Sequence, residues 1–179
     1  LVVDQNWDKV SEARQKGIET SFGSIVSEKT LESVNLDKIG RFLALTSNKG
    51  INSLASMHFS KIFESSNVYQ INTAPKFNQQ MGKELRGHFF SSERLSYPNI
   101  EHYESSLFIK ANTITNEFPF ERVIEYYGTD NIHPLFIIDK DNRLIIYSEK
   151  FSKIPEEGEI LISLILSDTK IKSVKGNKK

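Results

Sequence analysis

The stretch RFLALTSNKGINSLASMHFSKIF, residues 41–63, decides the fold because it joins a buried strand directly to a helix. The apolar run at its start is typical of a strand covered on both faces of a parallel sheet. After Asn48, six apolar side chains and one histidine recur at helical spacing on one face, so the helix must pack on something broad. The side chains expected on this face are Ile51, Leu54, Ala55, His58, Phe59, Ile62 and Phe63.

The flanking residues repeat this alternation of strand and helix. Further strands are expected at LVV (1–3), directly before Asp4, at IETSF (18–22) and at VYQIN (68–72), and helices over residues 7–16 and 25–36. Asn6 is suited to cap the first helix and Gly17 to end it. Strands that alternate with helices of this length favour a parallel sheet with right-handed crossovers. The sequence therefore predicts an α/β fold with a partial Rossmann-like parallel sheet over residues 1–72.

Small polar and acidic residues follow several of these strands, at the sheet edge where such folds bind ligands. A carboxylate at the tip of the first of these strands, Asp4, can accept both ribose hydroxyls of an adenine nucleotide and repels a 2′-phosphate. This favours NAD or AMP over NADP, and an ordinary turn or cap role for Asp4 stays open beside it. The predicted nucleotide-binding residues are Asp4, Asn6, Gly23, Ser24, Thr46, Ser47 and Asn48.

The order of these motifs resembles a known family. The runs VDQNWDKVSEARQKGIETSFGSIVSE, LDKIGRFLALTSNKGINSLASMHFSKIF and VYQI resemble the RCK/KTN (TrkA-N) domain that follows the membrane part of bacterial sodium:proton and potassium:proton antiporters. The resemblance implies a domain that binds NAD(H) or an adenine nucleotide and adjusts transport, usually as a dimer. It implies Asp4 as the ribose-binding acid, Gly23 and Ser24 as the turn beside adenine, and residues 46–48 as the loop over the ribose or phosphate side.

The glycine-rich loop of that family, with its first strand and first helix, does not occur in this sequence. That loop supplies the backbone N–H donors and the helix dipole that hold a pyrophosphate. We therefore expect a fragment of a larger antiporter, with weak or absent NAD binding of its own. The resemblance also implies a homodimer, joined to the transmembrane portion of the same polypeptide at the cytoplasmic face of the inner membrane.

The second half of the chain has a different residue pattern. Residues 73–105 lose periodicity and gain Pro, Gly and Ser, which predicts a linker or irregular region. Residues 106–166 predict a small α+β domain, with a strand over 106–115, a helix over 118–128, a hairpin around DKDN (139–142) and a last strand over 156–166. Residues 167–179 form a Lys-rich tail.

The composition and the motifs limit the classes of function that we expect for this chain. Lys plus Arg and Asp plus Glu number 23 each, so no overall field favours a nucleic-acid partner. Without cysteine, and with histidines that lack zinc spacing, we expect no metal site. No triad, Walker or nucleophile-elbow pattern occurs, so we expect a regulatory protein and not an enzyme. Two alternatives stay open: a fragment of an NAD-dependent oxidoreductase, or a purely dimerising module whose helix over 50–65 covers both sheet and partner.

Overall fold

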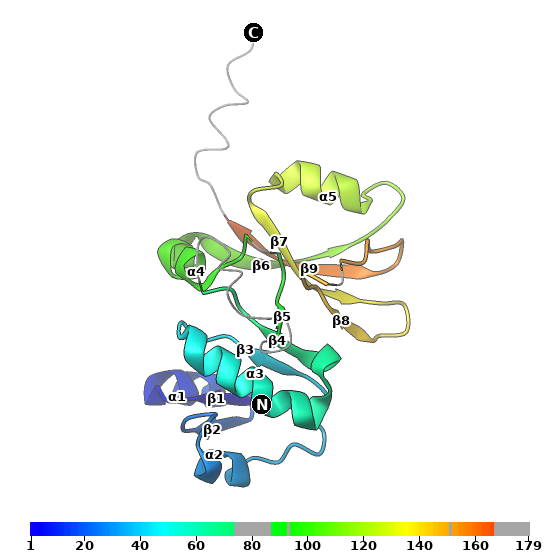
Figure 1. Cartoon of the computed structure of the whole chain (residues 1–179). Helices are drawn as coiled ribbons and strands as arrows, with labels where there is room; N and C mark the ends of the chain where they lie inside the picture. The colour runs from blue at the N-terminus through cyan, green and yellow to red at the C-terminus, as the bar shows by residue number, and fades with distance from the viewer. Residues whose placement is uncertain (74–86, 93, 151, 167–179) are drawn as a thin grey trace. The chain divides into compact units, whose positions relative to one another are not determined.

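The computed structural model describes residues 1–73, 87–92, 94–150 and 152–166. Within these residues the chain divides into two units (Figure 1). The N-terminal unit holds residues 1–70 with Gly87, and the C-terminal unit holds residue 71 onward apart from Gly87. The predicted Lys-rich tail and much of the predicted linker lie outside the described residues.

Strands and helices alternate in the N-terminal unit as the sequence predicts. The strands are β1 (Val2–Asp4), β2 (Thr20–Phe22), β3 (Phe42–Ala44) and β4 (Val68–Gln70). The helices are α1 (Trp7–Gln15), α2 (Glu28–Ser33), α3 (Lys49–Phe63) and the short 3-10 helix η1 (Ser65–Asn67). β1 pairs in parallel with β2, and β3 pairs in parallel with β4. These parallel pairs, linked through helices, confirm the predicted α/β class.

Helix α2 is shorter than the predicted 25–36 at both ends, and polar side chains close its C-terminal end. The hydroxyl of Ser33 donates to the Thr30 carbonyl at 2.8 Å, within the last turn. Two residues further on, the side chain of Asn35 accepts from the Asp37 N–H at 2.9 Å and forms a turn. Such local side-chain bonds compete with the helical backbone ladder.

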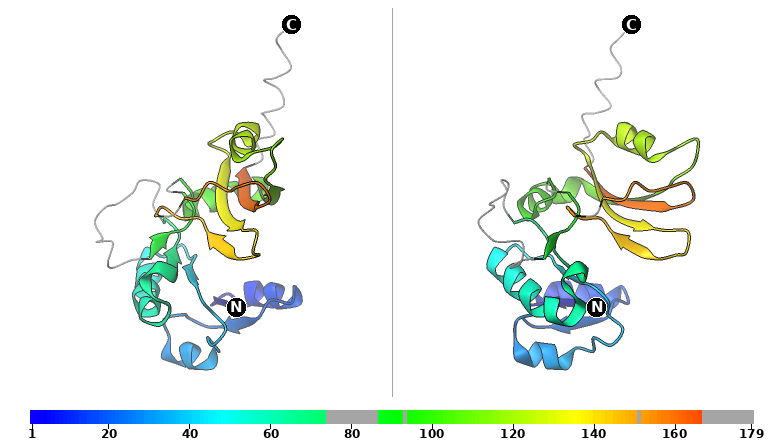
Figure 2. Two further views of the ribbon diagram at one scale, coloured as in Figure 1. Left: turned by 90° about the vertical axis from the view of Figure 1, so that its right-hand side faces the viewer. Right: turned by 45° about the vertical axis from the view of Figure 1, so that its right-hand side comes forward.

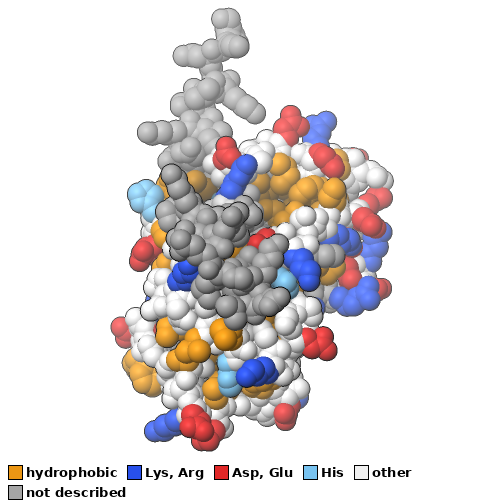
Figure 3. Space-filling view, viewed as in Figure 1, with side chains coloured by type: hydrophobic (Ala, Val, Ile, Leu, Met, Phe, Trp, Pro, Cys, Tyr) orange, Lys and Arg blue, Asp and Glu red, His pale blue; other side chains and the backbone are white. Residues whose placement is uncertain are grey.

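The core of the N-terminal unit lies under α3. Phe59 is 1% exposed and stacks on Phe42, with ring centroids 4.1 Å apart, and on Phe63 at 5.7 Å. Of the apolar face expected on this helix, Leu54, His58 and Ile62 are exposed, so the sheet covers only part of it. The buried stripe is narrower and includes small and polar side chains, namely Asn52, Ser53, Ala55 and Ser56. Hydrophobic side chains are accordingly visible at the surface over α3 (Figure 3).

The C-terminal unit is built on one antiparallel sheet. Its strands are β6 (Leu107–Thr113), β7 (Ile132–Ile138), β8 (Leu144–Ile146) and β9 (Ile160–Leu166), in the order β6-β9-β7-β8. β7 and β8 form the predicted hairpin, and β9, the last strand in sequence, lies between β6 and β7. Helix α5 (Phe120–Tyr127) lies over one face of this sheet (Figure 2).

Part of the segment that we expected to be irregular is regular. It contains the short strand β5 (His88–Phe89), helix α4 (Tyr97–Tyr103) and the 3-10 helix η3 (Glu104–Ser106). Leu95, just before α4, is 2% exposed. The signal was weak because α4 is one short helix with no buried residue, and it has a proline in its first turn. These residues pack as part of the C-terminal unit.

Candidate functional site

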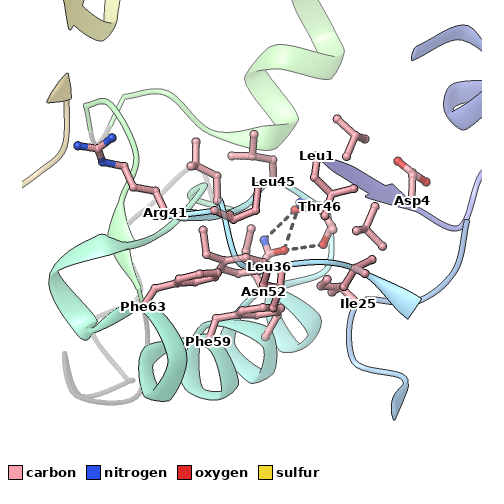
Figure 4. A pocket seen from close by; sticks show the side chains of 18 of the residues that line it. Leu1, Asp4, Ile25, Leu36, Arg41, Leu45, Thr46, Asn52, Phe59 and Phe63 are labelled. Atoms are coloured by element: carbon pink, nitrogen blue, oxygen red, sulfur yellow. Dashed lines mark hydrogen bonds between the residues drawn. The ribbon is translucent and has the colours of Figure 1, made fainter. Parts of the chain in front are cut away.

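An apolar groove of about 410 Å³ crosses the N-terminal unit (Figure 4). Both β1 and β3 line it, and α3 contributes Phe59 and Phe63. Among the described residues, β1 is bonded only to β2, and β3 stands at the end of its sheet. Each of the two strands therefore has one edge without a neighbouring strand, and both strands contribute to the groove.

Asp4 lies at the end of β1 and lines the groove. Its Oδ1 accepts a hydrogen bond from the Asn6 N–H at 2.8 Å, which forms a turn at the end of the strand. The side chain of Asn6 in turn accepts from the N–H groups of Asp8 and Lys9. Asn6 is thus the cap of α1, as its place in the sequence predicts, and it does not line the groove.

Gly23 and Ser24 form the turn after β2. The Gly23 N–H donates to the Asp4 carbonyl at 3.0 Å, and a side chain at Gly23 would collide with the hydroxyl of Thr30. The carbonyl of Ser24 accepts from the Ser27 N–H at 2.9 Å. Glycine is therefore needed here for close packing, and neither residue lines the groove.

Thr46 follows β3, lines the groove and is bonded to Asn52 of α3 (Figure 4). The Thr46 N–H donates to Asn52 Oδ1 at 3.2 Å, and Asn52 Nδ2 donates to the Thr46 carbonyl at 2.8 Å. Asn48 caps α3 by accepting from the Ile51 N–H at 3.0 Å. Asn48 and Ser47 are exposed and outside the groove lining.

The structure thus brings two of the seven predicted residues, Asp4 and Thr46, to one groove. As nucleotide contacts, all seven stay predictions. Asn52, which is 0% exposed, was missed by the sequence analysis. The only signal for it was an asparagine within the predicted apolar face of a helix. Arg41 also lines the groove and was not predicted.

The lining suits binding better than acid–base catalysis. Its charged side chains are Asp4 and Arg41, which Figure 4 shows on opposite sides of the view. The other walls are largely aliphatic or aromatic, and no histidine, lysine or serine occurs among the described residues that line the groove. A carboxylate beside apolar walls can hold a hydroxyl-bearing ligand with a flat apolar part.

Two further observations concern the described part of the chain. No three histidine, aspartate or glutamate side chains there are grouped in a way that could hold a metal ion. Of the helices in that part, none combines the length and the apolar character that crossing a bilayer requires.

The turn and the polar strand ends described above occur in one parallel α/β unit, in the order that the resemblance implies. Residues 1–85 match the TrkA-N domain. This match confirms the TrkA-N part of the resemblance. Asp4, Thr46 and Asn52, and with them the whole groove lining, fall within the TrkA-N region.

Solved structures similar to the whole chain are distant. They include the crystal structure of the GsuK RCK domain, at 13% identity and a TM-score of 0.34, with 97% of this chain and 45% of that chain covered. The GsuK channel bound to NAD matches at 13% identity and a TM-score of 0.34, covering 97% of this chain and 37% of that one. This chain therefore spans less than half the length of these proteins, and likeness at this level assigns it no ligand. No curated protein matches the chain.

Proposed function

We propose that this chain is part of the cytosolic regulatory region of a monovalent cation:proton antiporter, and that bound NAD(H) or AMP changes the rate of transport. The observation that carries the proposal is the meeting of Asp4 and Thr46 on one groove of the TrkA-N region, each just at or after the end of a parallel strand. A nucleotide that binds one conformation of such a region better than another shifts the equilibrium between them.

The groove supports a specific orientation for the nucleotide. One oxygen of Asp4 is used by the Asn6 N–H, and the second is suited to accept a ribose hydroxyl. Apolar walls beside Asp4, including Val3 and Ile25, fit a base. Thr46 is held in place by Asn52, so its position in the wall is fixed before the ligand arrives.

A site for the phosphates belongs to the same proposal. The unpaired edges of β1 and β3 suit one further parallel strand, since each backbone edge carries N–H and C=O groups that a neighbouring strand can bond. We propose that a strand and a glycine-rich loop from elsewhere in the polypeptide complete the sheet there. The 179-residue chain alone should then bind NAD weakly or not at all.

The proposal includes a homodimer. Leu54, Met57 and Ile62 of α3 are 54%, 44% and 49% exposed, and they share the exposed side of the helix with His58 and Lys61. An apolar stripe of this kind suits a second copy of the chain. The same stripe is what favours the alternative of a purely dimerising module, whereas no observation favours an oxidoreductase.

Transport by the full-length protein in vesicles, with and without NADH or AMP, tests the regulatory function. We expect the rate to change with nucleotide, and identical kinetics in every condition would remove the proposal. In the same protein, Asp4→Ala should weaken nucleotide binding at least about tenfold, because it removes the ribose acceptor. Asp8→Ala, a nearby exposed acid on α1, is the matched control and should leave binding unchanged.

A further inference from the structure

A second cavity, of about 280 Å³, lies among residues of the C-terminal unit, and the proposed function does not use it. Its apolar wall is formed by Leu95, Ile100, Leu107 and Leu166. Leu95 is 2% exposed and Leu107 begins β6, so this wall is anchored in the fold of the unit. The volume is just below the range of about 300–1,000 Å³ typical of pockets for drug-sized ligands. The cavity therefore suits one small molecule.

Two oppositely charged side chains, those of Arg94 and Asp130, line the exposed side of this cavity. Arg94 Nη1 donates to Asp130 Oδ1 at 2.6 Å, and the two side chains are 61% and 90% exposed. A guanidinium has five N–H donors and a carboxylate has two oxygens, so each partner keeps bonding capacity beyond this contact. Because an ion pair this exposed contributes little to stability, a ligand can insert between its members at small cost.

Neutral polar groups surround the charges. His133 lines the cavity half-buried, and burial holds the pKa of its ring below the ordinary value, with the nearby Arg94 cation acting in the same direction and Asp130 opposing it. This lowered pKa favours the uncharged form of the ring. Asn99 of α4 donates to the Arg94 carbonyl at 3.1 Å, which ties the backbone of the arginine to the helix.

We propose that this cavity binds a free amino acid with an apolar side chain. The carboxylate lies on Arg94, the ammonium group on Asp130, and the side chain on the wall of leucines and Ile100. A cation and an anion in direct contact, next to an apolar wall, complement a zwitterion with an apolar end. An ordinary fatty acid or amine would satisfy only one of the two charges. This cavity lies in the C-terminal unit, whereas the groove lined by Asp4 and Thr46 lies in the N-terminal unit. The amino-acid site therefore does not depend on the proposed function.

Calorimetric titration of the 179-residue chain tests the site. The probes are L-leucine, L-methionine and L-phenylalanine, compared with 4-methylpentanoate, which is leucine without its ammonium group, and 3-methylbutylamine, which is leucine without its carboxylate. We expect at least one amino acid to bind at least about tenfold more tightly than either analogue, since each analogue loses one charge-assisted contact. No saturation by any of the three amino acids up to about 10 mM overturns the proposal. Equal binding of 4-methylpentanoate or 3-methylbutylamine overturns the zwitterion assignment.

Substitutions then test whether the amino acid binds in this cavity. Arg94→Ala and Asp130→Asn should each weaken the binding of the tightest-binding amino acid at least about tenfold. Ile100→Trp should abolish binding by filling the cavity. The matched controls are Arg122→Ala and Glu125→Gln, which alter exposed charges on α5 outside the cavity lining. Unchanged affinity in Arg94→Ala would place the ligand elsewhere and overturn the assignment. Amide exchange of β7 and β9 in each variant shows that the unit is still folded.

Discussion

The hydroxyl of Thr46 donates to the side-chain oxygen of Asn52 at 2.6 Å, and the Asn52 amide donates back to the Thr46 carbonyl at 2.8 Å. Asn52 is 0% exposed, so its polar atoms depend on these bonds. The pair ties the end of β3 to the first turn of α3 and holds one wall of the groove in place.

Replacing Asn52 by alanine should therefore destabilise the N-terminal unit. The change leaves the N–H and C=O of Thr46 without their partner, and we expect a loss of about 1–3 kcal/mol in the free energy of unfolding. Urea denaturation measures this loss. The control Asn35→Ala removes one bond at an exposed position, and we expect an effect within about 0.5 kcal/mol. Equal effects of the two substitutions would show that the Thr46–Asn52 pair is not important for stability.

The stability of the C-terminal unit should depend on pH through Glu159, which is 3% exposed. Burial alone raises the pKa of its carboxyl, but the Lys153 ammonium and the N–H of Glu156 hold the pKa below its ordinary value. The stabilisation is then fully present above the unfolded-state pKa of about 4.3, and is lost as the pH falls through the lower folded-state pKa.

Comparing Glu159→Gln with the unchanged chain isolates this contribution. The substitution should cost about 1–3 kcal/mol at pH 7, because it weakens bonds to a charged group, and the difference should shrink towards pH 3. Glu157→Gln is the control, since Glu157 is exposed and bonded to Asn116. A Glu159→Gln penalty that stays constant between pH 7 and pH 3 would contradict the role of the charge.

The apolar stripe on α3 predicts self-association. Leu54→Glu should weaken the dimer at least about tenfold, since it places a charge in the proposed contact, and sedimentation measures the change. Ile109→Glu alters a side chain on β6 that is 68% exposed, and it should leave the association unchanged. An unmodified chain that stays monomeric at high concentration would remove the dimer from the proposed function.

The two units have separate hydrophobic cores, so damage to one core should stay local. Phe59 belongs to a cluster drawn from the N-terminal unit, and Ile137 to one drawn from the C-terminal unit. Phe59→Ala should cost about 3–5 kcal/mol and speed amide exchange in β3 and β4, while Ile137→Ala should cost about 2–5 kcal/mol and act on β7 and β9. Faster exchange in both units after either change would contradict independent cores.

Local signals in the sequence were sufficient to predict most elements of the N-terminal unit. The cap residues Asn6 and Asn48 mark the starts of α1 and α3, and Gly17, at φ +76°, ends the turn after α1. The inward face of α3 was predicted only in part, because helical spacing identifies apolar positions without showing which of them the sheet covers. Leu54 and Ile62 satisfy that spacing and are nevertheless exposed.

The site was harder to predict because caps, turns and ligand contacts use the same residue types. Asn6 and Gly23 are explained by local structure alone, whereas Asp4 both forms a turn and, like Thr46, lines the groove. The cavity beside Arg94 could not be predicted, since its walls come from segments far apart in the sequence.

The position of β9 has a consequence for synthesis in the cell. β6 and β7 do not pair with each other, because β9, which ends at residue 166, lies between them. While the chain is being translated, β6, β7 and β8 cannot form the finished sheet until β9 has also left the ribosome, so the apolar side chains of these strands stay exposed until then. In the N-terminal unit, β1 pairs with β2 and β3 pairs with β4, so these pairs can form between strands that are consecutive in sequence, whereas the second unit is exposed to aggregation for longer.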